Sequence, residues 1–188
     1  MPDAPFSLKG LIPLLSRALA MSPAALYERQ RALVRAGLLK SEGGKGPGSG
    51  VRATPQSVGL LLIAVLAADS LSEIEDATAR VAGLRALADI CPATGKKTFA
   101  SAIAAVLASP ELSRGVQRIT VDRRGIVAPG AHFDFVKKDG ETCSSYFVSA
   151  KHKRPGLLEI RASLMGFPLA SLFGLLAGNE PLPSELEK

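Results

Sequence analysis

Few side chains in this sequence could carry acid–base chemistry. His132 and Asp134 lie two residues apart on a predicted strand, so their side chains share one face, a spacing that can hold a metal ion or a proton-transferring pair. The neighbouring Phe133 and Phe135 indicate that this is the solvated side of a strand whose other side is buried. The other histidine, His152, lies in a basic run that disfavours both its protonation and metal binding.

The remaining nucleophiles and glycines do not complete a catalytic set. Ser144 and Ser145 stand beside Cys143, but the sequence places no base near them. Residues 43–50 contain Gly-x-Gly steps, yet a P-loop needs Gly-Lys-Ser/Thr running into a helix, and the residues after Lys45 depart from that pattern. The two cysteines are far apart, without Cys-x-x-Cys spacing. The sequence therefore predicts no enzyme, no metal site and no cofactor.

Positive charge is concentrated at the N-terminal end. Residues 1–54 hold eight Lys or Arg and three Asp or Glu, whereas residues 55–112 carry an excess of two negative charges. Residues 113–188 carry an excess of three positive charges. A basic excess favours a polyanionic partner. Two further basic clusters, Arg123-Arg124 and residues 151–154, are interpreted as solvated turns, with a second contact to nucleic acid or an acidic partner as the alternative.

The basic region is predicted to contain two helices and a glycine-rich loop. Leucines spaced along one face predict a helix over residues 8–19, which Pro13 either bends or divides. A Ser-Pro start and a glycine end predict a second helix over residues 22–37. Residues 38–40 and 51–53 are predicted to be short strands on either side of the loop.

Residues 21–39 resemble the recognition helix of bacterial winged helix-turn-helix transcriptional regulators. The resemblance covers about residues 8–55 and implies that the helix enters the major groove while the loop forms a wing on the DNA. Two positions depart from the family, Gln30 at a usually apolar core position and Glu28 at a usually basic or neutral contact. The resemblance is carried by Met21-Ser22, Tyr27, Ala32-Leu33 and Ala36-Gly37-Leu38.

The helical period sorts this segment into an inner and an outer face. Leu26 and Leu33 point to the core, while the opposite side is free to reach DNA. On that side Arg31 suits a guanine edge or a phosphate, Tyr27 a phosphate or a thymine methyl group, and Glu28 a cytosine amino group. The predicted DNA-contacting residues are Ser22, Ala24, Tyr27, Glu28, Arg31, Lys40, Lys45 and Arg52.

Beyond the basic region the sequence predicts helices and then strands. Residues 58–66 are apolar nearly all round, which predicts either a central core helix or a dimer seam. Ser72-x-x-Glu75 resembles a capping box and predicts a helix to about residue 88. Further elements are predicted as a helix over 98–108, strands over 116–121, 132–136, 146–148 and 158–162, and an apolar helix over 168–177.

These elements predict an α+β protein of three parts. Residues 1–55 are expected to form a winged helix-turn-helix DNA-binding domain, and residues 56–110 a helical core or dimerisation segment. Residues 111–188 are expected to form an α+β domain for oligomerisation or for a ligand or protein partner. In it a small, mainly antiparallel sheet would be closed by a C-terminal helix.

The function predicted from these features is that of a sequence-specific, repressor-like transcriptional regulator from a bacterium or mobile element. It would bind double-stranded DNA as a homodimer and be cytoplasmic, associated with the nucleoid through DNA. The longest charge-free apolar stretch, residues 58–68, is too short to span a bilayer. The alternative is a protein-interaction adaptor that uses the winged helix for docking and binds no DNA.

Overall fold

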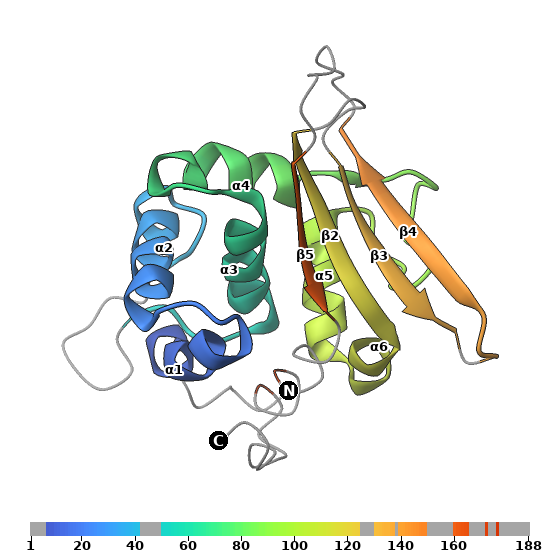
Figure 1. The fold of residues 1–188 in the computed structure, drawn as a ribbon, viewed down its shortest axis with the longest axis horizontal. Helices are drawn as coiled ribbons and strands as arrows, with labels where there is room; N and C mark the ends of the chain where they lie inside the picture. Colours follow the sequence, from blue (N-terminus) through green and yellow to red (C-terminus); the bar gives the residue numbers. More distant parts are fainter. Residues whose placement is uncertain are drawn as a thin grey trace.

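The computed structural model describes residues 7–41, 50–124, 130–137, 139–149 and 160–165, with Leu172 and Leu176. These residues form an α+β fold in which helices precede an antiparallel sheet, as predicted (Figure 1). Of the predicted closing helix, residues 168–177, only Leu172 and Leu176 are described, and Leu172 is buried in the core.

Helix α1 (Leu8–Ala18) begins where Ser7 accepts a hydrogen bond from the backbone N–H of Gly10. Pro13 lies inside α1 without dividing it, so one continuous helix forms. The Pro13 ring removes one backbone bond, and because the carbonyl four residues earlier belongs to exposed Lys9, water can satisfy that carbonyl. The buried face of α1 consists of Leu8, Leu11, Ile12 and Leu15.

Helix α2 (Pro23–Arg35) has the predicted Ser-Pro start, with Ser22 accepting a hydrogen bond from the N–H of Ala25. The two short strands predicted after it are not observed, since residues 38–41 are not in a strand. Arg52 instead makes an isolated antiparallel bridge to Ser7. The segment around Arg52 is thus held against the residue that precedes α1.

Helix α3 (Pro55–Ala67) is the central helix of the molecule. Thr54 and Ser57 form a reciprocal capping box at its start. The helix packs against α2, α4, α5 and the sheet, so its nearly all-round apolar surface is covered within one chain. A Cβ atom at Gly59 would lie only 3.1 Å from Ile103 Cγ2 of α5, which shows how closely the two helices approach. The core-helix interpretation of this segment is confirmed.

The helix predicted from Ser72 to about residue 88 begins and ends differently. The capping box is formed by Ser70 and Glu73 around a short 3-10 turn, η1 (Leu71–Glu73), and α4 (Ile74–Ala82) follows it. The chain then becomes extended in β1 (Arg85–Ala86), which pairs with β4. Pairing with a distant strand ends the helix earlier than the local pattern predicted.

Two more helices precede the long strands. Helix α5 (Phe99–Ala108) starts after its Thr98 cap, and α6 (Pro110–Gly115) uses Pro110 as its first residue. The helix predicted over residues 98–108 is confirmed, whereas α6 was not predicted. Pro110 both ends α5 and opens α6, because proline lacks the N–H that a first-turn residue does not need.

The sheet has the order β1-β4-β3-β2-β5, with antiparallel pairing throughout. Its long strands are β2 (Val116–Arg124), β3 (Gly130–Val136), β4 (Thr142–Val148) and β5 (Ile160–Met165). Helices α3 and α5 pack on one face (Figure 1). There Phe99 of α5 lies 5.2 Å, ring centre to ring centre, from both Phe133 and Phe147.

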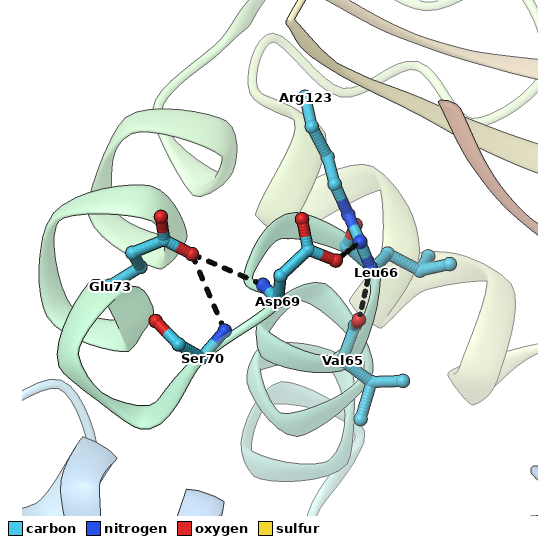
Figure 2. A network of polar contacts seen from close by, with 6 residues as sticks. All are labelled: Val65, Leu66, Asp69, Ser70, Glu73 and Arg123. Atoms are coloured by element: carbon cyan, nitrogen blue, oxygen red, sulfur yellow. Dashed lines mark hydrogen bonds and ion pairs between the residues drawn. The ribbon is translucent and has the colours of Figure 1, made fainter. Parts of the chain in front are cut away.

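Arg123 of β2 joins the sheet to the C-terminal end of α3 (Figure 2). Its guanidinium donates to the carbonyls of Leu66 at 2.5 Å and Val65 at 3.0 Å, and it pairs with the Asp69 carboxylate. The interpretation of Arg123 as part of a solvated turn is therefore wrong. Helix α3 has no basic residue in its own last turn, and Arg123 supplies the positive charge from another element.

Candidate nucleic-acid interface

Helix α2 has an inner face fixed in the core and an outer face open to solvent. Leu26 and Leu33 are fully buried, and Gln30 between them is buried as well. Ala24 and Arg31 on the outer side are exposed, and Tyr27 is partly exposed. The division predicted from the helical period is therefore present, and the side chains proposed for DNA contact lie outward.

Arg31 and Glu28 form an ion pair on this outer face. Arg31 Nη1 donates to Glu28 Oε1 at 3.0 Å, and the side chains are 55% and 39% exposed. An exposed pair of this kind contributes only about 0–1 kcal/mol. Arg31 can therefore exchange the carboxylate for a phosphate or a guanine edge at little energetic cost.

A lysine from α1 lies over the Tyr27 ring, a contact that was not predicted from the sequence. The Lys9 ammonium of α1 lies 5.4 Å from the centre of the Tyr27 ring, a cation–π contact. The contact brings a positive charge from α1 to the outer face of α2. Only the packing of α1 on α2 reveals this contact, because Lys9 and Tyr27 lie on different helices.

Arg35 was also missed, although the helical period contained the signal. It follows Arg31 by four residues, so it lies on the same side one turn further along, and it is exposed. Ser22, at the other end of α2, is exposed as well, and its hydroxyl caps the helix. Predicted contacts thus span the whole outer face of α2.

The residues predicted to lie along the wing are only partly described. Lys40 and Arg52 are exposed, on either side of residues 42–49. Lys45 lies outside the described residues. The structure therefore brings together the predicted residues of α2, and adds Lys9 and Arg35 to them.

The charge of this region is strongly one-sided. Residues 7–41 and 50–54 hold seven Lys or Arg, and Glu28 is their one acidic residue. Arg29 points away from the outer face, and its Nη1 donates to the Ala25 carbonyl at 3.4 Å. Its charge acts inward: burial lowers the pKa of Arg123, and the nearby Arg29 lowers it further.

His132 and Asp134 share one face of β3, as predicted. His132 Nε2 lies 3.9 Å from Asp134 Oδ2, and Ser144 donates to the other carboxylate oxygen at 2.7 Å. Phe133 and Phe135 are buried on the opposite side, as expected for one solvated and one core face. Within the described part of the chain, no group of three or more His, Cys, Asp or Glu side chains could hold a metal ion.

A polar cavity of about 480 Å³ lies where α3, α4 and β2 meet. Its charged lining is largely engaged within the protein. Asp69 pairs with Arg123, and a Glu73 carboxylate oxygen accepts from the backbone N–H groups of Asp69 and Ser70, both at 3.3 Å (Figure 2). This arrangement stabilises the joint between the helices and the sheet.

Both cysteines are free, Cys91 in the core and Cys143 half-buried on β4. Among the residues that the structure describes, no helix has the length and apolar character needed to cross a membrane.

Comparison of the chain with protein-family models, with curated proteins and with solved structures found no match.

Proposed function

We propose that this protein is a DNA-binding transcriptional regulator that inserts the outer face of α2 into the major groove. The observation that carries the proposal is the contrast between the two faces of α2. Leu26 and Leu33 anchor one face, while Tyr27, Arg31 and Arg35 stand along the other in a region rich in positive charge. A rigidly held helix with outward cations can both reach base edges and bind phosphates.

Each outer residue has a defined task in this proposal. Arg31 leaves Glu28 and donates to a guanine edge or a phosphate, and Glu28 then accepts from a cytosine amino group. Ala24 is small enough to contact a thymine methyl group. Tyr27 donates its hydroxyl to a phosphate while Lys9, above its ring, contributes positive charge. The exposed Lys40 and Arg52 add phosphate contacts beside the helix.

The proposed DNA-binding unit is a homodimer acting as a repressor. A single helix and wing bury little DNA surface, so a lone module does not reach useful specificity. A two-fold dimer would place two α2 helices about 34 Å apart, one turn of B-DNA, and would read a palindromic site. A protein bound in this way blocks other proteins from the same stretch of duplex.

The alternative role as an adaptor finds less support. A docking helix needs apolar side chains on its exposed face. The large apolar side chains that are exposed among the described residues are Leu71, Leu87, Ile90, Tyr146 and Met165, none of them on α1 or α2. The outer face of α2 is suited to phosphates and base edges instead.

Selection from a random duplex pool, followed by titration of the enriched sequence, tests the proposal. Arg31→Ala should lower the slope of log affinity against log salt by about one unit, because one phosphate or base contact is lost. Arg114→Ala is the matched control, since Arg114 is an exposed arginine on α6. The proposal fails if no sequence is enriched, or if both variants have the salt slope of the parent protein.

A further inference from the structure

The sheet has a second face that the packing against α3 and α5 leaves unused. Cross-strand partners share a face, so the register Thr120–His132–Tyr146 and Arg118–Asp134–Ser144 defines a polar face across β2, β3 and β4, on which Thr120 itself is buried. Strand β5 extends it, with Ser163 opposite Thr120 and Met165 opposite Arg118. The exposed side chains on this polar sheet face include Arg118, Ser144, Tyr146, Arg161, Ser163 and Met165.

Two aromatic rings lie side by side at the middle of this face. Tyr146 of β4 and His132 of β3 have ring centres 5.4 Å apart and planes inclined by 35°. Tyr146 is 53% exposed. Its ring surface is therefore available to another flat, apolar group, while His132 supports it from the neighbouring strand.

Arginines surround these rings. Arg118 lies on β2 and Arg85 on β1, both exposed, and no carboxylate of the described residues lies within ion-pair distance of either. Arg161 pairs with Asp122 at 3.0 Å, whereas Asp134 accepts a hydrogen bond from the neutral Ser144 hydroxyl and keeps its charge opposite Arg118. Arg85 and Arg118 outnumber this carboxylate, so the excess charge on the face is positive.

We infer that the polar sheet face is a binding platform for single-stranded nucleic acid. A base stacks on Tyr146 beside His132, and Arg118 and Arg85 bind the phosphates on either side. The five strands span about 19 Å at ordinary strand spacing, which accommodates a short stretch of extended chain. The Ser144 oxygen, whose proton is donated to Asp134, and the Ser163 oxygen on β5 lie on the same face and can accept hydrogen bonds from base amino groups or sugar hydroxyls.

This platform is separate from the outer face of α2, and the chain offers a direct way to tell them apart. It contains two tyrosines, Tyr27 on α2 and Tyr146 on the sheet, and no tryptophan. Full-length protein labelled with fluorotyrosine gives one fluorine NMR signal from each surface. Tyr27→Phe and Tyr146→Phe assign the two signals.

The experiment titrates the labelled protein with short oligothymidylate, short oligouridylate and a mixed-sequence duplex. The single strands are expected to shift the Tyr146 signal and leave Tyr27 in place, and the duplex to shift Tyr27. A preference between the DNA and RNA strands identifies the sugar that the platform reads. If the single strands shift only Tyr27, or shift neither signal, the platform is overturned and the ring pair serves only to stabilise the sheet.

Affinity measurements add a second readout. Tyr146→Ala should weaken binding of the single strand by about 5- to 150-fold, the loss expected for one stacked base, whereas Tyr146→Phe should keep most of it. Arg118→Ala should lower the salt slope by about 0.7. Arg31→Ala, on α2, should leave single-strand binding unchanged. The sheet platform and the proposed duplex interface on α2 are therefore tested independently, and either can be contradicted without the other. Equal affinity of Tyr146→Ala and parent would contradict the platform.

Discussion

At the scale of single residues, Glu28 is the one carboxylate on α2, and it pairs with Arg31 on the outer face of that helix. Glu28 keeps Arg31 in an ion pair at 3.0 Å in the free protein. The same carboxylate opposes the approach of phosphates. In the proposed DNA complex, Glu28 would reduce affinity and increase specificity, because its negative charge would penalise every DNA site that offers it no donor.

Replacing the Glu28 carboxylate should change the ratio of specific to non-specific DNA binding. Glu28→Gln is expected to raise affinity for unrelated duplex DNA, because Arg31 is released and one repulsive charge is removed. Affinity for the selected site should change less, so the ratio of specific to non-specific binding falls. Gel-shift titrations of both DNAs at one salt concentration measure this ratio, and a ratio that rises would contradict the assigned role of Glu28.

Arg123 is the residue on which the joint between helices and sheet depends. It donates to the Val65 and Leu66 carbonyls and pairs with Asp69, and its side chain is largely buried. Arg123→Met is expected to lower the free energy of unfolding by about 3 kcal/mol, because these acceptors lose a charged donor inside the protein. Urea denaturation measures the loss.

The control for that substitution is Arg118→Met, an exposed arginine on the same strand. It should change the free energy of unfolding by no more than about 0.5 kcal/mol. Equal stability of the two variants would show that the contacts of Arg123 contribute nothing net.

At the scale of elements, the helices begin at caps that the neighbouring residues supply. Helices α2, α3 and α6 start at Ser-Pro or Thr-Pro, and α5 starts at Thr98. The cap satisfies a backbone N–H and the proline presets the first turn. The positions of α2 and α5 were predicted to within two residues, because every group involved is adjacent in the chain, whereas α6 was not predicted.

The cap of the central helix should therefore have a measurable effect on stability. Thr54→Ala removes the acceptor for the Ser57 N–H and is expected to lower the free energy of unfolding by about 1 kcal/mol. Thr54→Ser keeps the hydroxyl and should retain most of it. Thermal unfolding of the two variants separates the two causes. If the lost cap matters, only Thr54→Ala is destabilised, whereas lost packing of the threonine methyl group would destabilise both variants.

At the scale of the whole molecule, one hydrophobic core runs from α1 through α3 and α5 into the sheet. It includes Leu15 of α1, Ile63 of α3, Ile103 of α5 and Phe147 of β4. The predicted boundaries near residues 55 and 110 therefore cross a shared core. Since α3 packs against helices on one side and strands on the other, the parts are expected to unfold together.

Cooperative unfolding can be followed with the same two tyrosines. Fluorine signals from Tyr27 and Tyr146 should lose their folded positions at the same urea concentration, because α3 couples the two ends. Agreement with the midpoint from circular dichroism would support one cooperative unit. Separate midpoints for Tyr27 and Tyr146 would show instead that the N-terminal helices form an independent domain.

The sequence by itself determined the features that depend on neighbours in the chain. These are the Ser-Pro start of α2, the two faces of α2 with Leu26 and Leu33 inside, the presence of four long strands, and the buried and solvated sides of β3. Helical and strand periods are properties of contiguous residues, so they can be recognised from the sequence alone.

Only the tertiary structure decided which distant residues meet. It placed Lys9 over Tyr27, turned Arg123 to the end of α3, and drew β1 out of a segment predicted as helix to pair with β4. Arg123 and Val65 are separated by 58 residues, and no local pattern specifies such a pairing. Contacts of this range form when the shared core fixes the elements relative to one another, since only then is the entropy of closing so long a loop offset.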